Sequence, residues 1–292
     1  MKLRNQRFLI RVVGLLLVVT GFGNAIGQQL AVKPPPRPFE PGEELTYKAE
    51  ISRALLKKLD VATFKFSTDR ATAGITRDSP IQSPPANVLK FTGDVFSDGF
   101  FTNLFNVHFH QHIESTVDLE SLTVQKTVKL DEQGKRVRAS EANFDQKKGK
   151  VVWIERDPND PTRPQRTVSA DFSGQVQDVV SAIYYLRTQP LDLGKGFALT
   201  ISDSGRVLQI PVRVVERKHM KTVLGPVSVL RVEPLLFGEQ GLVKAKGQFS
   251  VWLTDDYRHI PVSAQLKSEF GTFDITLKKI SHQPSKLSLA KE

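Results

Sequence analysis

The sequence predicts a mostly β protein, built as a strongly curved antiparallel sheet or open half-barrel with one helix. Apolar and polar residues alternate in segment after segment from Glu44 onward, which is the period of a half-buried strand. Turn-rich breaks separate these segments, as an antiparallel meander requires. Helical spacing occurs in one place, near residues 178–188. A two-sheet β-sandwich fits the same pattern and is the alternative.

The first residues predict export. Four basic residues precede an apolar run over residues 12–22, and the small residues Ala25 and Gly27 lie three and one positions before a cut ahead of Gln28. This is the layout of a secretory signal peptide, here residues 1–27. The apolar run is shorter than the roughly 20 residues of a membrane span, and an uncleaved anchor is the second interpretation. We expect a protein of the periplasm or cell envelope, with no membrane span in its mature form.

Composition narrows the function further. The chain contains no cysteine, which excludes disulfides, thiol nucleophiles and cysteine-ligated metals. Its formal net charge is +10, but removal of residues 1–27 leaves 37 basic against 31 acidic residues, or +6. The basic residues are scattered rather than clustered, so we expect no nucleic-acid partner.

The rest of the chain divides into a spacer, one domain and a tail. Residues 28–42 hold five prolines between Pro34 and Pro41 and predict an extended spacer. We interpret residues 43–281 as a single β-rich domain and residues 282–292 as a polar tail. The first expected strands cover residues 44–51, 61–68, 87–95, 105–115, 122–130 and 150–155.

The second half of the domain follows a loop at residues 157–164, where the proline spacing excludes regular structure. The helix comes next, with Asp178 as its cap and Pro190 as its limit. The tripeptide from Asp203 to Gly205 then predicts a tight hairpin turn, because glycine supplies the positive φ that such a turn needs. Alternating strands continue from there to the end of the domain.

Three histidines form the most chemically suggestive pattern. His108, His110 and His112 lie at alternate positions, so a strand places them on one face together with Glu114. Such residues are about 6.6 to 7 Å apart along a strand, and two imidazoles can converge on one ion. With a carboxylate from elsewhere they would hold zinc or iron. A solvent-facing side of a strand gives the same alternation and is the competing interpretation.

A group of phenylalanines surrounds the histidines. Such a group lines a cavity for an acyl chain, since ligand pockets are mainly apolar and aromatic. It fits equally a packed core, or a loop folded over the end of a barrel. Its members are Phe96, Phe100, Phe101, Phe105 and Phe109.

Catalytic signatures are missing from the sequence. It has no G-x-S-x-G elbow, P-loop, dinucleotide glycine fingerprint or H-E-x-x-H helix. Asp255, Asp256 and His259 could act as acid and base, but nothing nearby supplies a nucleophile or an orienting group. Aspartates also form tight turns, and Pro261 suits the start of a strand. We therefore interpret this stretch as the corner between two strands, and the sequence favours a non-enzymatic protein without deciding against an enzyme.

Six segments stand out in this order: FEPGEELTYKAEI, ESTVDLESL, ANFDQKKGKVV, DVVSAIYYLR, VWLTDDYRHIPV and FGTFDITL. Together they resemble the domain-of-unknown-function 3108 family of exported bacterial proteins, over roughly Phe39 to Ile280. The most distinctive motifs of this resemblance contain Asp178, Ser181, Arg187, Trp252, Asp256 and Pro261.

The resemblance implies an exported protein without an assigned reaction. The chain departs from the family in SRALLKKLD, where the family often has a small glycine-containing turn after its first strand, and in the triple histidine, which the family pattern lacks. The closing segments are also similar to periplasmic lipoprotein carriers, which are half-barrels with a helical plug and an apolar cavity. That second likeness concerns the fold rather than the function.

The sequence leaves three functions open. The first is an exported, non-enzymatic envelope protein that needs no cofactor and binds a lipid-like ligand or a partner segment in an apolar concave face. The second is a metal-binding protein or metal-dependent hydrolase that uses zinc or iron on His108, His110 and His112. The third is a structural component of the envelope that acts through a protein partner.

Overall fold

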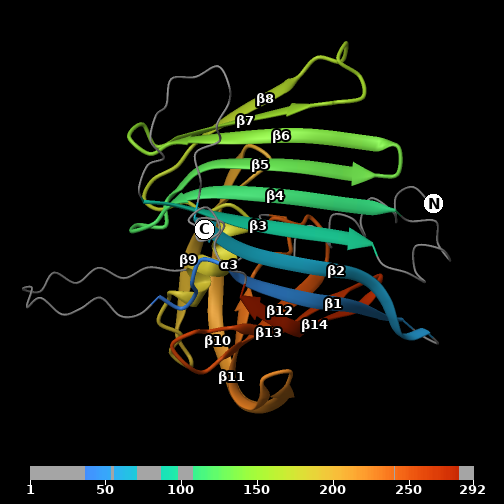
Figure 1. The fold of residues 1–292 in the computed structure, drawn as a ribbon, viewed down its shortest axis with the longest axis vertical. Helices are drawn as coiled ribbons and strands as arrows, with labels where there is room; N and C mark the ends of the chain where they lie inside the picture. The colour runs from blue at the N-terminus through green and yellow to red at the C-terminus, as the bar shows by residue number, and fades with distance from the viewer. Residues whose placement is uncertain (1–36, 54–55, 71–86, 98–107, 240, 283–292) are drawn as a thin grey trace, which may run out of the picture.

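The computed structural model describes residues 37–53, 56–70, 87–97, 108–239 and 241–282. These residues form one antiparallel sheet of 14 strands with one short helix (Figure 1). The predicted mostly β fold is confirmed, and the strands belong to one sheet rather than to the two sheets of a sandwich. The elements are β1 (Glu43–Arg53), β2 (Leu56–Arg70), β3 (Val88–Ser97), β4 (Phe109–Asp118), β5 (Val124–Gln133), β6 (Arg136–Asp145), β7 (Lys150–Arg156), β8 (Arg166–Asp171), α3 (Ser181–Arg187), β9 (Gly196–Asp203), β10 (Arg206–Thr222), β11 (Gly225–Pro234), β12 (Gly247–Thr254), β13 (Pro261–Ser268) and β14 (Gly271–His282).

Two meanders build the sheet. β1 to β8 form the first and β9 to β14 the second, and β1 pairs with β14 to join them. Figure 1 shows the first meander running across the view while β9 to β11 cross it steeply. In the described part of the chain no pairing joins β8 to β9. The sheet therefore curves without closing, as the half-barrel interpretation predicts.

Irregular register accounts for part of this curvature. The pairing shifts in β1 between Thr46 and Tyr47, in β10 between Val214 and Glu216, and again within β12. Such bulges bend a strand and increase its twist locally. The bends turn the sheet around α3, which Figure 1 places between the first meander and β9.

The inner face of the sheet and α3 share one core. Buried and half-buried residues alternate along β1 and β4, as the sequence pattern predicts. Tyr184 of α3 is fully buried and stacks on Phe91 of β3, with ring centroids 4.2 Å apart. Phe39 meets Tyr184 edge-on at 5.2 Å. Gly93 of β3 makes room for the helix, since a Cβ there would come 2.9 Å from Val180 Cγ2.

The helix is confirmed, although α3 is shorter than the pattern over residues 178–188. It covers seven residues, and a turn from Asp178 to Val180 precedes it. The Asp178 carbonyl accepts a hydrogen bond from the Ala182 amide at 3.0 Å, so helical bonding begins at the predicted cap. Among the described residues no helix is long and apolar enough to cross a membrane.

The loop at residues 157–164 is placed differently from the prediction. It joins β7 to β8 inside the first meander, and the change of meander comes at α3. Proline spacing excludes regular structure but carries no information on strand order. The predicted signal peptide, residues 1–27, lies outside the described residues, as does the tail from residue 283 onward. The spacer is described from Arg37, and its Phe39 is only 3% exposed.

Candidate functional site

Arg187, the last residue of α3, carries a side chain that is 0% exposed. Its guanidinium donates to both carboxylate oxygens of Glu43 on β1, at 2.5 and 3.1 Å. It also donates to the carbonyl oxygens of Pro38 and Arg258, at 2.5 and 3.0 Å, and lies 5.5 Å from the ring of Phe39. A buried charge is tolerated when it is paired and hydrogen-bonded in this way. We call these residues the arginine anchor.

The corner between β12 and β13 is tied to the same anchor. His259 Nδ1 lies 2.9 Å from the Arg187 carbonyl oxygen, and the Tyr47 hydroxyl donates to the Pro261 carbonyl at 2.7 Å. Burial raises the pKa of Tyr47 well above its usual value of 10.0, so the phenol keeps the proton that this bond needs. Two of the predicted motif residues, Arg187 and Pro261, are thus brought to one place.

The other end of α3 holds two more motif residues. Asp178 Oδ1 accepts hydrogen bonds from the amides of Val180 and Ser181 at 2.8 and 2.9 Å. Ser181 Oγ accepts one from the Asp178 amide at 2.9 Å, so the two side chains cap the helix reciprocally. Asp178 Oδ2 also accepts from Thr127 Oγ1 of β5 at 2.6 Å. The cap therefore also joins the helix to the sheet.

The acidic corner does not gather its residues into one site. Asp256 Oδ1 accepts from the backbone amide two residues on at 3.0 Å, as an aspartate turn does. Asp255 pairs with Arg217 Nε at 2.7 Å, and His259 turns to the helix instead. Trp252 lies under Lys218 of β10, whose Nζ is 4.9 Å from the centroid of the indole ring. This geometry fits a structural corner rather than an acid–base pair.

A seam separates β8 from β9, and the turn between β9 and β10 lies across it. At Gly205 of this turn, a Cβ would come 2.6 Å from Val168 Cβ of β8 and 3.3 Å from Trp153 Cβ of β7. The φ of Gly205 is +76°, a conformation that glycine adopts without strain. Gln177 adds a short parallel bridge to Ile201 of β9. Between β8 and the β9–β10 turn, the seam is closed by side-chain packing.

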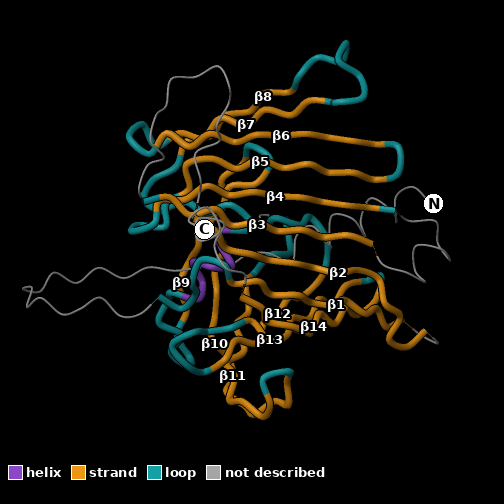
Figure 2. The backbone as a smooth tube through the Cα atoms, in the orientation of Figure 1, coloured by secondary structure: helices purple, strands orange, loops and turns teal. Residues whose placement is uncertain are grey.

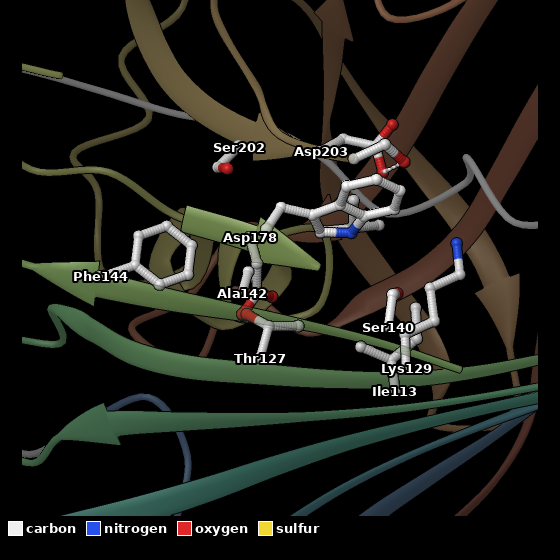
Figure 3. A pocket seen from close by; sticks show the side chains of 12 residues that line it. Ile113, Thr127, Lys129, Ser140, Ala142, Phe144, Asp178, Ser202 and Asp203 are labelled. Atoms are coloured by element: carbon white, nitrogen blue, oxygen red, sulfur yellow. Dashed lines mark hydrogen bonds between the residues drawn. The ribbon is translucent and has the colours of Figure 1, made fainter. Parts of the chain in front are cut away.

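A cavity of about 40 Å³ lies behind the seam (Figure 3). It has room for two or three water molecules, whereas sites for drug-sized ligands measure roughly 300–1,000 Å³. Polar groups from the helix cap and the β9–β10 turn face a floor on which apolar side chains lie beside Thr127, Lys129 and Ser140. The lining consists of Ile113, Thr127, Lys129, Ser140, Ala142, Phe144, Trp153, Asp178, Val179, Ser202, Asp203 and Ser204.

The histidines lie on the outer face of the sheet. His110 Nδ1 is 2.9 Å from Glu132 and its Nε2 is 3.3 Å from Asp94 Oδ1, which also lies 2.7 Å from His112 Nδ1. His108 is exposed, one residue before β4. Partial burial disfavours a charged imidazole, but the hydrogen bonds to Glu132 and Asp94 outweigh it and raise the pKa of His110 above 6.5. Within the described residues no group of three or more His, Asp or Glu side chains is arranged to hold a metal ion.

The phenylalanines do not share one face. Phe109 is 6% exposed on the inner face, whereas Phe96 lies directly opposite His110 and therefore on the outer face. The remaining members, Phe100, Phe101 and Phe105, fall outside the described residues. The two that can be compared do not line a common cavity.

The sequence analysis did not identify the residues that bind Arg187 and His110 or all of those that line the cavity. Glu43 holds Arg187, Asp94 and Glu132 hold His110, and Trp153 forms part of the cavity lining. Three of them stood in segments that the sequence singles out: Glu43 in FEPGEELTYKAEI, Asp94 in the expected strand 87–95 and Trp153 in the expected strand 150–155. Only the strand order brings them to their partners, and periodicity does not contain that order.

The amino-acid sequence of the chain matches a known protein family. Residues 57–278 match the family described as "Protein of unknown function (DUF3108)", so the resemblance predicted from the sequence is confirmed. No curated protein matches the chain.

The chain also matches several solved structures. A β-barrel-like protein of the domain of unknown function DUF1849 from Brucella abortus is 12% identical, with a TM-score of 0.49 over 83% of this chain and 98% of that one. A protein from Bacteroides fragilis, described as exported and with a YmcC-like fold, is 8% identical, with a TM-score of 0.34 over 84% and 98% of the two chains. A protein from Parabacteroides distasonis, described as a lipoprotein, is 8% identical, with a TM-score of 0.30 over 84% and 97%.

Proposed function

Because the chain belongs to the DUF3108 family of proteins of unknown function, we propose its function from its own residues: a non-enzymatic protein of the cell envelope that binds a lipid-like molecule at the seam between β8 and β9. Export rests on the signal-peptide layout of residues 1–27. Export places the protein where lipids and other envelope proteins are its neighbours.

The observation that carries the proposal is how the seam is closed. A closed barrel would have backbone hydrogen bonds between its first and last strands. Here the β9–β10 turn rests on Val168 and Trp153 through side-chain contact at Gly205. Parting such a contact breaks no strand pairing, so the seam is the place where the fold opens most easily.

The chemistry of the lining favours an apolar ligand. The apolar part of the lining continues into the core of the sheet and lies beside Thr127, Lys129 and Ser140; it consists of Ile113, Ala142, Phe144, Trp153 and Val179. A cavity of about 40 Å³ does not hold an acyl chain, so the ligand requires the β9–β10 turn to move away from β8. Ligand uptake therefore depends on opening of the seam.

An engineered disulfide tests this dependence, since the chain has no cysteine of its own. A Cβ at Gly205 would lie 2.6 Å from Val168 Cβ, and a turn that shifts by about 1 Å brings a Gly205→Cys, Val168→Cys pair within disulfide range. We expect the oxidised variant to bind a fluorescent dansyl-labelled fatty acid at least about tenfold more weakly than the same protein after reduction. Fluorescence titration before and after reduction measures this difference.

The single variants Gly205→Cys and Val168→Cys are the matched controls, because each carries the local change without the crosslink. If the oxidised and reduced forms of the double variant bind the labelled fatty acid equally well, the ligand does not enter through the seam. If the wild-type protein does not bind the probe and carries no extractable lipid after export, the lipid-binding function is wrong. The structural-component hypothesis then takes its place.

The histidines do not lead to a second proposal. Their distances to Asp94 and Glu132 are those of hydrogen bonds. In the described part of the chain no set of three or more side chains has a metal-binding arrangement. The function proposed above does not involve these histidines.

A further inference from the structure

The turn between β10 and β11 displays two apolar side chains that the turn itself does not need. Val223 and Leu224 are 51% and 40% exposed. The turn is held by Thr222, whose Oγ1 donates to the Gly225 carbonyl and accepts from the Leu224 amide, both at 3.0 Å. Gly225 adopts the positive φ of 88° that closes such a turn. Backbone geometry would thus be served equally well by polar residues at the two central positions.

Two other hairpin turns of the sheet use polar residues in this place, whereas the β13–β14 turn carries a half-buried Phe270. The β5–β6 turn consists of Gly134 and Lys135, and the β6–β7 turn consists of residues 146–149, with the sequence Gln-Lys-Lys-Gly. Gly, Asn, Asp and Ser are the usual turn residues. The valine and leucine of the β10–β11 turn therefore require an explanation other than the fold.

The same hairpin projects beyond its neighbours. β11 pairs with β12 only from Val229 onward, so its first four residues pair with β10 alone. At about 3.3 Å per residue, the tip extends roughly 13 Å past the edge of β12. Figure 2 shows the β10–β11 hairpin at the lower extreme of the molecule, beyond β12 and β13. At the base of the projection the Asp255 amide donates to the Ser228 carbonyl at 2.9 Å.

Basic residues lie along the hairpin. Lys221, opposite Pro226 in the projecting part, is exposed. Lys218, opposite Val229 at the base, is half-buried, and its Nζ lies 4.9 Å from the Trp252 ring centroid. In the described ranges neither lysine is within ion-pair distance of a carboxylate.

Two acidic side chains beside the hairpin are already engaged: Glu216 of β10 pairs with Arg231 at 2.8 Å, and Asp255 of the β12–β13 corner pairs with Arg217 at 2.7 Å. The hairpin therefore combines a small apolar surface at its tip with the positive charge of Lys221, which no carboxylate neutralises within the described residues.

We infer that the β10–β11 hairpin docks the protein on a membrane surface that carries anionic lipid headgroups. A protein partner needs a broad surface of about 800 Å² per side, which a two-residue tip does not offer. A membrane interface accepts a few apolar side chains at the depth of the headgroups. Juxtaposed lysines are attracted by anionic lipids and give the contact its preference for charge. This surface is separate from the seam and does not depend on the function proposed for it.

Vesicle flotation tests the docking surface with the protein recovered after expression of the full chain. We expect wild-type protein to bind vesicles of phosphatidylglycerol and phosphatidylcholine, and to bind phosphatidylcholine vesicles at least about tenfold more weakly. The Val223→Ser, Leu224→Ser double variant should lose at least about tenfold in binding to the anionic vesicles. A Lys218→Gln, Lys221→Gln variant should bind both kinds of vesicle alike.

The matched control is a Leu193→Ser, Leu235→Ser double variant, which removes two leucines that are 51% and 47% exposed but lie off the hairpin. It should bind as the wild type does. Thermal unfolding of each variant confirms that the fold survives. Binding by the Val223→Ser, Leu224→Ser variant within about twofold of the wild type would overturn the inference, as would wild-type protein that ignores anionic vesicles. Binding of the labelled fatty acid should be the same in all these variants, which separates this result from the seam.

Discussion

The C-terminal end of α3 is fixed by distant parts of the chain, whereas its N-terminal end is fixed largely by its own first turn. Arg187 binds Glu43 and Pro38, which lie 144 and 149 residues away in the sequence. Asp178 instead accepts from the amides two and three residues after it, and among the described residues only Thr127 reaches it from the sheet. The two ends are about 13 Å apart along the helix.

The two ends of this short helix therefore have different roles: the C-terminal end stabilises the fold, and the N-terminal end borders the proposed ligand site. The arginine anchor holds the spacer end, β1 and the β12–β13 corner at a single point. The capped end borders the cavity and the seam. Opening of the seam would therefore disturb the capped end and leave the anchor in place. Variants at each end show whether the two are independent.

Arg187→Ala should have the largest effect. It leaves the Glu43 carboxylate, 4% exposed, without its main partner, and breaking a buried ion pair costs about 3–5 kcal/mol. Arg258 Nη2, 3.5 Å from Glu43, moderates this loss toward the lower value. Urea denaturation gives the free energy of unfolding. Arg217→Ala is the matched control, because its ion pair with Asp255 is exposed and should contribute below about 1 kcal/mol. Similar losses in both variants would refute the anchor.

Asp178→Ala should cost less, about 1–2 kcal/mol, since loss of a cap lies in this range. Asp178→Asn keeps a side-chain oxygen for the two amides and should recover most of the loss. The same urea experiment measures both. If Asp178→Ala destabilises the protein as strongly as Arg187→Ala, the two ends of α3 do not differ as the structure indicates.

Tyr47 and Tyr184, two buried phenols near the anchor, sharpen the comparison further. Tyr47→Phe removes the hydrogen bond to the Pro261 carbonyl, 2.7 Å long, and should cost about 1 kcal/mol. The Tyr184 hydroxyl has no hydrogen-bond partner among the described residues, so Tyr184→Phe should be neutral or slightly stabilising. Thermal unfolding of the two variants side by side tests this opposite behaviour. Equal destabilisation would mean that both hydroxyls are bonded.

Local pattern was enough to predict most elements of this molecule. Alternation predicted the strands except β6 and β8, where no strand was expected, and the spacing of apolar residues after Asp178 predicted the helix and its cap. The family motifs even contained Arg187 and Pro261, residues that the anchor brings together. Each of these features is encoded within about a dozen neighbouring residues.

Contacts between distant residues could not be predicted in the same way. Glu43 meets Arg187 because β1 pairs with β14 and α3 enters the concavity, and no periodicity contains that topology. Phe96 and Phe109 suggested one cluster because they are close in sequence, yet β3 and β4 direct them to opposite faces. The contact of Gly205 with Val168 likewise depends on how far the whole sheet curves.

His110 lies on the outer face, away from both ends of α3, and should show the smallest effect, with a defined pH dependence. Its pKa in the folded protein is raised above 6.5, so the folded state favours the protonated imidazole. The resulting stabilisation is fully present below pH 6.5 and disappears as the pH rises through the raised pKa. His110→Gln should therefore destabilise the protein by a few tenths of a kcal/mol at about pH 5 and leave stability unchanged at about pH 9. With its side chain 43% exposed, solvent screening keeps the effect small. Urea denaturation at the two pH values measures it, and a loss that is larger at the higher pH would show that His110 is stabilised as a neutral group.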